Sequence, residues 1–165
     1  HTDLLTGLLN RRGLDEALQP LLSHGPAGGR LAVYLLDLDG FKAVNDGFGH
    51  AAGDEVLCEV AQRITQQMRQ GDVLARLGGD EFGIVMRDGP AESAQALAKR
   101  IVRAVSQPIK LSSGDEVGVG VSVGMAAYGD DVMSVRKLVS QADQALYEAK
   151  KQNERRWKMF VGMRA

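Results

Sequence analysis

This sequence cannot form an internal disulfide bond, has no excess of charge of one sign and contains no long apolar run. Its only cysteine is Cys58, so no disulfide can form within the chain, which is typical of a reducing compartment. Its 20 Lys and Arg residues are balanced by 21 Asp and Glu residues. Proteins that bind nucleic acid without sequence preference are usually basic, so we expect no DNA or RNA partner.

No segment of the sequence has the character of a membrane span or a signal peptide. The longest early apolar run, 31–36, is far too short to cross a bilayer, and the first residues are not signal-like. We therefore expect a cytoplasmic domain with no direct membrane segment of its own, although the full-length protein could be anchored through segments elsewhere.

The length of the chain indicates one domain over residues 1–165, which is large enough to bury a sizeable core. A hydrophobic content of 44% and a charged content of 25% are ordinary for a globular protein. Position 1 is His and not Met. We therefore expect this domain to be a piece of a longer, multidomain protein.

Apolar periodicity predicts the secondary-structure elements. We expect a flexible link at 23–30, a short helical turn at 41–44, and helices at 51–68, 91–106 and 134–151. Strands are predicted at 31–38, 72–77, 81–87, 109–111 and 117–127. The order strand, helix, strand, strand, helix, strand predicts an α/β (α+β) fold of the split βαβ, ferredoxin-like kind. We expect its mostly antiparallel sheet to be covered by helices on one side, leaving the other face for a partner or substrate.

The most informative segment is Gly78-Gly79-Asp80-Glu81, which lies between two predicted strands. Two glycines in such a place predict a tight hairpin turn, and their lack of a side chain lets a ligand approach the backbone. Adjacent carboxylates are costly to hold together unless a cation neutralises them. The alternative is an acidic, solvated turn, but Asp37 and Asp39 form a second acidic cluster at the end of another strand.

Several spaced motifs together resemble the GGDEF family of diguanylate cyclases. Gly78-Gly79-Asp80-Glu81-Phe82 is similar to the signature of that family. The other matching blocks are 3–12 (DLLTGLLNRR), 37–46 (DLDGFKAVND), 48–50 (FGH), 53–54 (GD), 122–124 (SVG) and 142–150 (ADQALYEAK). They cover essentially the whole chain in the expected order, and such agreement is far more specific than one motif. The resemblance implies a palm-type nucleotide cyclase fold.

The family reaction joins two GTP molecules into cyclic di-GMP and releases two pyrophosphates. The resemblance implies Mg²⁺ or Mn²⁺, two ions per site, because phosphoryl transfer needs cations to offset developing charge. Its metal ligands would be Asp37, Asp80, Glu81 and the Leu38 carbonyl. The family gives the proton-accepting role to the signature pair, usually to its first acid, here Asp80. We expect Asp39 to point to the other side of its strand and to be structural.

Guanine recognition requires an amide and a carboxylate that face the edge of the base. Asn45 and Asp54 match the family positions for this role, and His50 lies between them in the sequence. Taken alone, Asn45 would be read as a turn residue and Asp54 as an acid in the first turn of a helix. The register of the surrounding blocks favours the guanine site.

The phosphates have their own candidate residues. Gly78 and Gly79 would lie against the substrate, and Lys42 is placed for phosphate or transition-state charge, the alternative being a solvated helix lysine. Lys150 matches the family's triphosphate contacts. One departure from the family is Glu154, which stands where a basic residue is expected, and a carboxylate there would repel the phosphates. Arg155 or Arg156 could compensate after a shift of one residue.

A second site is predicted at Arg69-Gln70-Gly71-Asp72. It resembles the family's RxxD motif, at which cyclic di-GMP binds as a feedback inhibitor. The arginine fork suits phosphate and guanine. The alternative is an ordinary i,i+3 ion pair. We expect Arg100 to add a second arginine from a neighbouring subunit.

Three functions remain open at this point. The first is the cyclase, which requires a transient or regulated homodimer because one site holds one GTP. The second is a non-catalytic domain that binds GTP or cyclic di-GMP and signals to an attached EAL-type phosphodiesterase. The third is another metal-dependent nucleotidyl enzyme with a palm-like fold. Degenerate family members usually lose a signature acid, so the presence of Asp37, Asp80 and Glu81 favours the cyclase.

Overall fold

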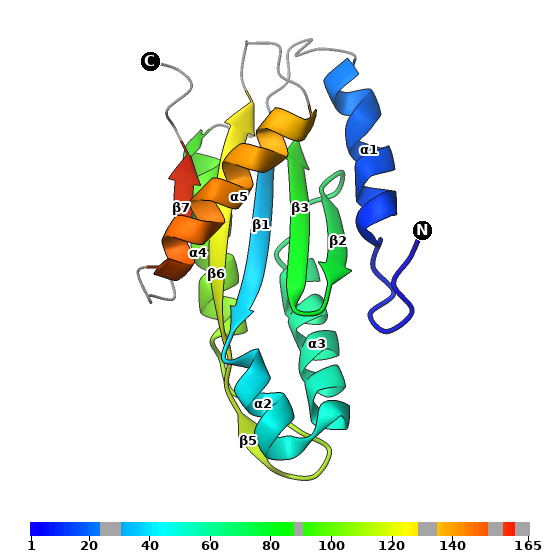
Figure 1. Ribbon diagram of the computed structural model, residues 1–165, viewed down its shortest axis with the longest axis vertical. Helices are drawn as coiled ribbons and strands as arrows, with labels where there is room; N and C mark the ends of the chain where they lie inside the picture. Colours follow the sequence, from blue (N-terminus) through cyan, green and yellow to red (C-terminus); the bar gives the residue numbers. More distant parts are fainter. Residues whose placement is uncertain (24–30, 88–90, 129–134, 152–156, 161–165) are drawn as a thin grey trace.

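A mixed sheet forms the centre of the computed structural model, which describes residues 1–23, 31–87, 91–128, 135–151 and 157–160. Its five strands lie in the order β2-β3-β1-β6-β7 (Figure 1). They are β1 (Leu31–Asp39), β2 (Val73–Gly78), β3 (Glu81–Arg87), β6 (Gly120–Tyr128) and β7 (Trp157–Phe160). The pairs β2–β3, β3–β1 and β1–β6 are antiparallel, and β6–β7 is parallel. The predicted mostly antiparallel sheet is therefore confirmed.

Helices cover both faces of the sheet. Five helices lie in the described ranges: α1 (Arg11–Ser23), α2 (Phe41–Phe48), α3 (His50–Thr65), α4 (Ala91–Val105) and α5 (Val135–Lys151). In Figure 1, α5 crosses in front of the sheet and α1 lies along its β2 edge, whereas α3 and α4 lie behind it. Our expectation of helices on one side only was wrong. The central strand is buried on both faces, which requires a helical layer on each.

The central strand β1 divides the core by alternation. Tyr34 and Leu36 belong to the larger apolar cluster, which includes α3 and α4, whereas Val33 and Leu35 belong to the cluster that includes α1 and α5. Residues at even and odd positions of a strand point to opposite faces. Asp37 and Asp39 therefore continue the face that α1 and α5 cover.

Three local predictions differ from the structure. Helix α2 continues through Asn45 to Phe48, whereas only a short helical turn at 41–44 was predicted. The predicted strand at 117–127 is divided, because β5 (Glu116–Val117) pairs with β4 (Ile109–Lys110) in a separate hairpin before β6 begins. Strand β7 was not predicted, since four residues give too little pattern to recognise. Of the link expected at 23–30, Ser23 ends α1, and residues 24–30 lie outside the described residues, as do Glu154 and its neighbours.

Helix α5 is held unusually close to the sheet. A Cβ atom on Gly124 of β6 would collide with the backbone nitrogen of Leu146 and the carbonyl oxygen of Ala142. Only glycine allows this approach, so this contact sets the depth of α5 over the sheet. None of the helices in the described ranges has both the length and the apolar content that a bilayer span requires.

The end of α4 is fixed by a side chain from α3. The Arg63 guanidinium donates to four backbone carbonyl oxygens at and beyond the last turn of α4, those of Ala104, Val105, Gln107 and Pro108, at 2.6–3.4 Å. Its Nε also donates to Glu59 at 2.9 Å. The last carbonyls of a helix have no partners within it, so Arg63 satisfies groups that would otherwise need water.

Candidate active site

The β2–β3 turn presents Asp80 at the end of the sheet. Gly78 already pairs with Glu81, so the turn consists of Gly79 and Asp80 and not of the two glycines, as the sequence had suggested. A register shift between Arg76 and Gly78 moves the turn along by one residue. Gly78 and Gly79 have φ values of +144° and +51°, which are strained for other residues.

Strand pairing brings the predicted metal-binding acids together. The backbone N–H of Leu38 donates to the carbonyl of Asp80 at 3.2 Å, and Asp37 lies directly opposite Glu81 in the β1–β3 ladder. Side chains of directly opposed residues in an antiparallel pair share a face, with Cβ atoms about 4.5–5.5 Å apart. The ends of β1 and β3 thus bring the carboxylates of Asp37 and Asp80 close together and set Glu81 opposite Asp37 in the ladder.

The pKa of Asp37 is raised by its surroundings in this cluster. Partial burial and the neighbouring charge of Asp80 raise the pKa of Asp37 from 3.8 to about 6, although Lys150 opposes the increase. The Lys150 ammonium lies 3.4 Å from Asp37 and 3.1 Å from Asp39. Burial lowers the pKa of Lys150, but the hydrogen bond to Asp39 and the charges of both acids outweigh it, so the net direction is upward. The single positive charge of Lys150 therefore does not balance the negative charges of Asp37 and Asp80.

The prediction for the direction of Asp39 was wrong. Residues two apart on a strand point to the same face, not to opposite faces, and Lys150 contacts both Asp37 and Asp39. Asp39 also accepts hydrogen bonds from the buried Ser122 hydroxyl at 3.1 and 2.9 Å. In the sequence, Ser122 stood out only as part of the 122–124 motif. A correct use of strand periodicity would have placed Asp39 on the same face of β1 as Asp37.

The donor set fits a hard divalent cation that arrives with phosphate. Within the described ranges, no three acidic, histidine or cysteine side chains form a group that could hold a metal ion on their own. Asp37 and Asp80 nevertheless provide a pair of carboxylates that one lysine does not neutralise. Mg²⁺ commonly takes one or two carboxylates and completes its shell with water and substrate phosphates, and the Leu38 carbonyl lies beside Asp37 in the chain.

An arginine fixes the turn from the other side. Arg76 Nε donates to the carbonyl of Gly79 at 2.9 Å, and its Nη1 lies 3.0 Å from Asp3 Oδ1. Asp3 also accepts from the backbone and hydroxyl of Thr6. These hydrogen bonds and the charge of Arg76 outweigh burial and lower the pKa of Asp3. The N-terminal segment is thereby tied to the turn that carries Asp80, a connection that the sequence motifs did not reveal.

The predicted guanine residues lie where α2 and α3 pack. A Cβ on Gly53 would collide with the side-chain oxygen of Asn45, so the Asn45 amide lies against Gly53 in the first turn of α3, the residue before Asp54 in the chain. Asp54 and His50 are exposed at that end of α3. Lys42 is 91% exposed and pairs with Asp46 at 3.3 Å. The structure thus brings Asn45 to the helix turn that carries Asp54, while Lys42 points to solvent.

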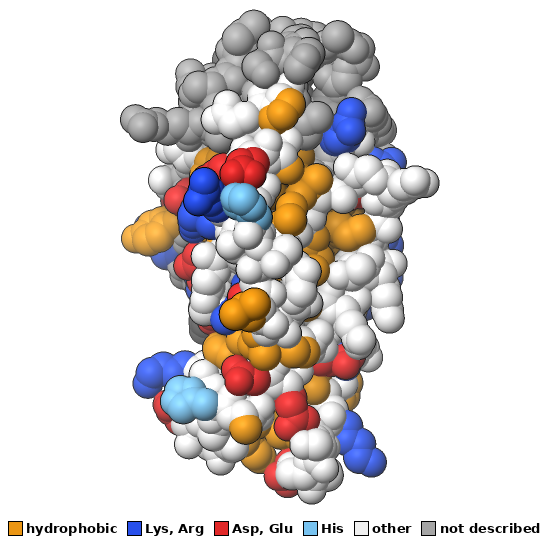
Figure 2. Space-filling view, turned by 90° about the vertical axis from the view of Figure 1, so that its right-hand side faces the viewer, with side chains coloured by type: hydrophobic (Ala, Val, Ile, Leu, Met, Phe, Trp, Pro, Cys, Tyr) orange, Lys and Arg blue, Asp and Glu red, His pale blue; other side chains and the backbone are white. Residues whose placement is uncertain are grey.

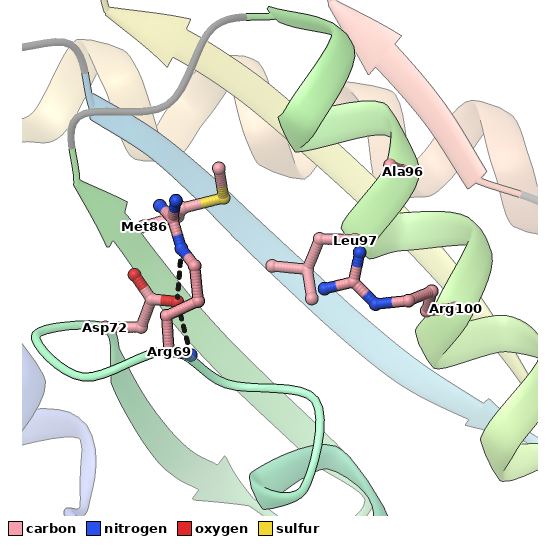
Figure 3. A pocket seen from close by; sticks show the side chains of 6 residues that line it. All are labelled: Arg69, Asp72, Met86, Ala96, Leu97 and Arg100. Carbon is pink, nitrogen blue, oxygen red and sulfur yellow. Dashed lines mark hydrogen bonds and ion pairs between the residues drawn. The ribbon is translucent and has the colours of Figure 1, made fainter.

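The predicted inhibitory residues line one hollow of about 150 Å³, together with Met86, Ala96 and Leu97. Figure 3 shows Arg69 and Asp72 on one wall and Arg100 of α4, from the same chain, on the opposite wall. The Asp72 carboxylate is only 3% exposed and accepts from the backbone N–H of Arg69 at 2.9 Å. Arg69 Nη2 also donates to the carbonyl of Arg87 at 2.9 Å. Without a ligand, the motif therefore stabilises its own turn.

The family described as "Diguanylate cyclase, GGDEF domain" matches residues 1–156. The chain belongs to the GGDEF family. This GGDEF domain is 42% identical over 159 residues to the bifunctional diguanylate cyclase/cyclic di-GMP phosphodiesterase MucR of Pseudomonas aeruginosa, covering 96% of the chain and 23% of MucR. It is 40% identical over 157 residues to the diguanylate cyclase TpbB of the same species, covering 92% of the chain and 35% of TpbB. The chain thus spans well under half the length of either relative.

Solved structures of GGDEF domains share the fold. The GGDEF domain of TpbB from Pseudomonas aeruginosa superimposes with a TM-score of 0.92 at 37% identity, covering 98% of this chain and 95% of that one. A coiled-coil and GGDEF structure of DgcB from Caulobacter crescentus, solved in complex with c-di-GMP, has a TM-score of 0.89 at 30% identity and covers 96% and 84%. The expected fold class is therefore confirmed.

Proposed function

We propose that this GGDEF domain is a diguanylate cyclase that condenses two GTP molecules into cyclic di-GMP. In each half-reaction, the 3′-oxygen of one GTP bonds to the α-phosphorus of the other. The bond from that phosphorus to the bridging oxygen breaks, and pyrophosphate leaves. The observation that carries the proposal is the pair of Asp37 and Asp80, held by the pairing of β1 with the Gly79–Asp80 turn and in need of a cation.

The carboxylates of the site would themselves repel the substrate. Figure 2 views the molecule from the side of α1 and β2 and shows acidic side chains together with basic and histidine side chains over its lower end, where Figure 1 places α2 and β5. A triphosphate that approached Asp37 and Asp80 without a cation would be repelled. Bound Mg²⁺ would offset the phosphate charge and stabilise the attacking and leaving oxygens. Asp37, Asp80, Glu81 and the Leu38 carbonyl are the residues that would hold it.

The remaining residues bind and orient the nucleotide. Asn45 and Asp54 would take the edge of guanine, because an amide and a carboxylate complement its acceptor and its two kinds of donor. The bare backbone of Gly78 and Gly79 leaves room for the phosphates, and Lys150 supplies a positive charge beside them. Asp80 would accept the proton of the attacking hydroxyl. Since one domain holds one GTP, two domains must face each other across their β2–β3 turns, in a two-fold arrangement.

We further propose that cyclic di-GMP inhibits the domain at Arg69, Asp72 and Arg100. Two arginines face each other across the hollow, and such planar forks suit phosphate and guanine. The hollow is smaller than a usual ligand site of about 300–1,000 Å³, so it would hold only part of the dinucleotide. Six residues of β2 separate Asp72 from the catalytic turn, roughly 20 Å at about 3.3 Å per residue. Inhibition would therefore be non-competitive with GTP.

The decisive experiment is a turnover assay with the purified domain, GTP and Mg²⁺, followed by separation of the nucleotides. Asp80→Asn should abolish cyclic di-GMP formation without unfolding the domain, because this turn carboxylate contributes to charge balance and little to packing. The matched control is Asp15→Asn on the exposed face of α1, which should behave as wild type. Near-normal turnover by Asp80→Asn would refute the assignment. Binding of GTP without product in the wild type would support a non-catalytic regulatory domain instead.

A further inference from the structure

A polar chain that starts at the buried Ser122 links β6, β1 and α5 beside the carboxylate cluster. Ser122 is only 1% exposed, and its hydroxyl donates a hydrogen bond to the Asp39 carboxylate at 2.9 Å. Asp39 in turn accepts from the Lys150 ammonium at 3.1 Å. A buried hydroxyl that loses its acceptor costs free energy, so Ser122 holds the Asp39 carboxylate in one orientation.

We propose that Asp39 and Ser122 are positioning residues that hold the Lys150 ammonium toward the triphosphate. The inference deepens the proposed cyclase function and rests on it. A lysine side chain is long and flexible, and it loses much conformational freedom when it is held in one place. In the ligand-free chain, Lys150 is shared between Asp37 and Asp39. Once Asp37 binds a cation, Asp39 is the anchor that remains for Lys150.

The backbone supports the same arrangement independently. Gly124 lies two residues after Ser122 on β6 and permits the close contact with Leu146 of α5. Lys150 lies four residues after Leu146, about one helical turn further along the same face. Ser122 lies two strand residues from Gly124, and Lys150 lies four helix residues from Leu146, which are similar distances along the two elements. The contact between Gly124 and Leu146 therefore sets Lys150 at the level of Ser122 and Asp39. The close approach of α5 to β6 and the hydrogen bonds of Asp39 thus fix the position of the Lys150 ammonium.

A competing interpretation predicts the opposite sign. If Asp39 did not position Lys150, its negative charge would only repel the triphosphate, and Asp39→Asn would tighten GTP binding. If Asp39 positions Lys150, the same substitution should weaken binding, because the neutral amide holds the ammonium less firmly. We expect a loss of about twofold to tenfold in affinity, the range of one net hydrogen bond, because the Lys150–Asp39 pair is partly exposed.

The test measures binding of a GTP analogue with a methylene group between its α- and β-phosphates, by calorimetry in Mg²⁺, so that no turnover occurs. Asp39→Asn is compared with Ser122→Ala, Lys150→Ala and the double variant Asp39→Asn/Lys150→Ala. Because Asp39 acts through Lys150, Asp39→Asn should weaken binding in the wild-type background and have no further effect once Lys150 is Ala. Ser122→Ala should weaken binding in the same direction and by less.

Two controls separate this inference from the function on which it rests. Asp15→Asn should bind the analogue as the wild type does. Thermal unfolding should show that each variant is folded. If Asp39→Asn does not fold, Ser122→Ala still tests the inference. In turnover, Asp39→Asn should raise the KM for GTP more than it lowers kcat. Equal or tighter binding by Asp39→Asn, or equal losses in both backgrounds, would overturn the inference while leaving the cyclase intact. No binding by the wild type would overturn both.

Discussion

Replacing Asp37 by Asn should stabilise the metal-free domain while removing a ligand from its proposed metal site. Asp37 is 20% exposed and lies beside Asp80, so its ionised form is unfavourable in the folded chain. Asn has nearly the same shape and no charge. It should therefore relieve the repulsion with Asp80 and the cost of burial, at the expense of the ion pair with Lys150.

The magnitude follows from the pKa of Asp37, which rises from 3.8 to about 6 on folding. Between these values the folded state binds more protons than the unfolded state, so Asp37 lowers the stability progressively as pH rises. At about 1.4 kcal/mol per pH unit, the full penalty is about 3 kcal/mol above pH 7 and about 1 kcal/mol at pH 4.5. The attraction of Lys150 is already included in this pKa.

The assay is urea denaturation in EDTA at pH 7.5 and at pH 4.5, comparing wild type, Asp37→Asn and the exposed control Asp15→Asn. Asp37→Asn should have the higher free energy of unfolding at both pH values, with the larger difference at pH 7.5. Asp15→Asn should show no such gain. With Mg²⁺ and the GTP analogue present, the wild type should gain stability by binding, and Asp37→Asn should gain much less.

Two results would refute this reasoning. If Asp37→Asn were less stable than the wild type at pH 7.5 in EDTA, Asp37 would contribute favourable contacts that outweigh its charge. If the difference were the same at both pH values, it would not arise from ionisation of the carboxylate. Either outcome would also weaken the case that this pair needs a cation.

Three further predictions follow from the contacts of individual residues. Arg63→Met should lower the free energy of unfolding by about 2 kcal/mol, because partly buried carbonyls at the end of α4 lose their hydrogen-bond donors. Urea denaturation, with Arg63→Lys measured alongside, checks this. An unchanged free energy of unfolding in Arg63→Met would contradict it. Gly124→Ala should lower the melting temperature and weaken GTP binding, because its Cβ would push α5 and Lys150 outward; unchanged GTP affinity would separate the glycine from the site. Arg69→Ala should lose at least tenfold in affinity for cyclic di-GMP by calorimetry, with basal turnover preserved; equal affinity would reduce the motif to a surface ion pair.

Local patterns were sufficient for most of the architecture. The four-residue apolar spacing of α3 and the apolar run of β1 predicted elements that the structure confirms within a few residues, because each buries a face whose period is visible in the sequence. The order of the elements was likewise enough for the fold class. The covering of both sheet faces was missed, although β1 carries a signal for it. A strand buried on both faces has a continuous apolar run, as residues 31–36 do.

The same division holds within the site. The sequence by itself determined which residues are the candidates for the chemistry, because the acids, the glycines and Asn45 occur in spaced motifs. Only the tertiary structure showed that Asp39 faces Lys150, that Ser122 holds Asp39, and that Arg76 ties the turn to Asp3. These contacts join residues 73–111 positions apart in the chain. No local period records such pairs, because they depend on strand pairing and on how closely α5 approaches the sheet.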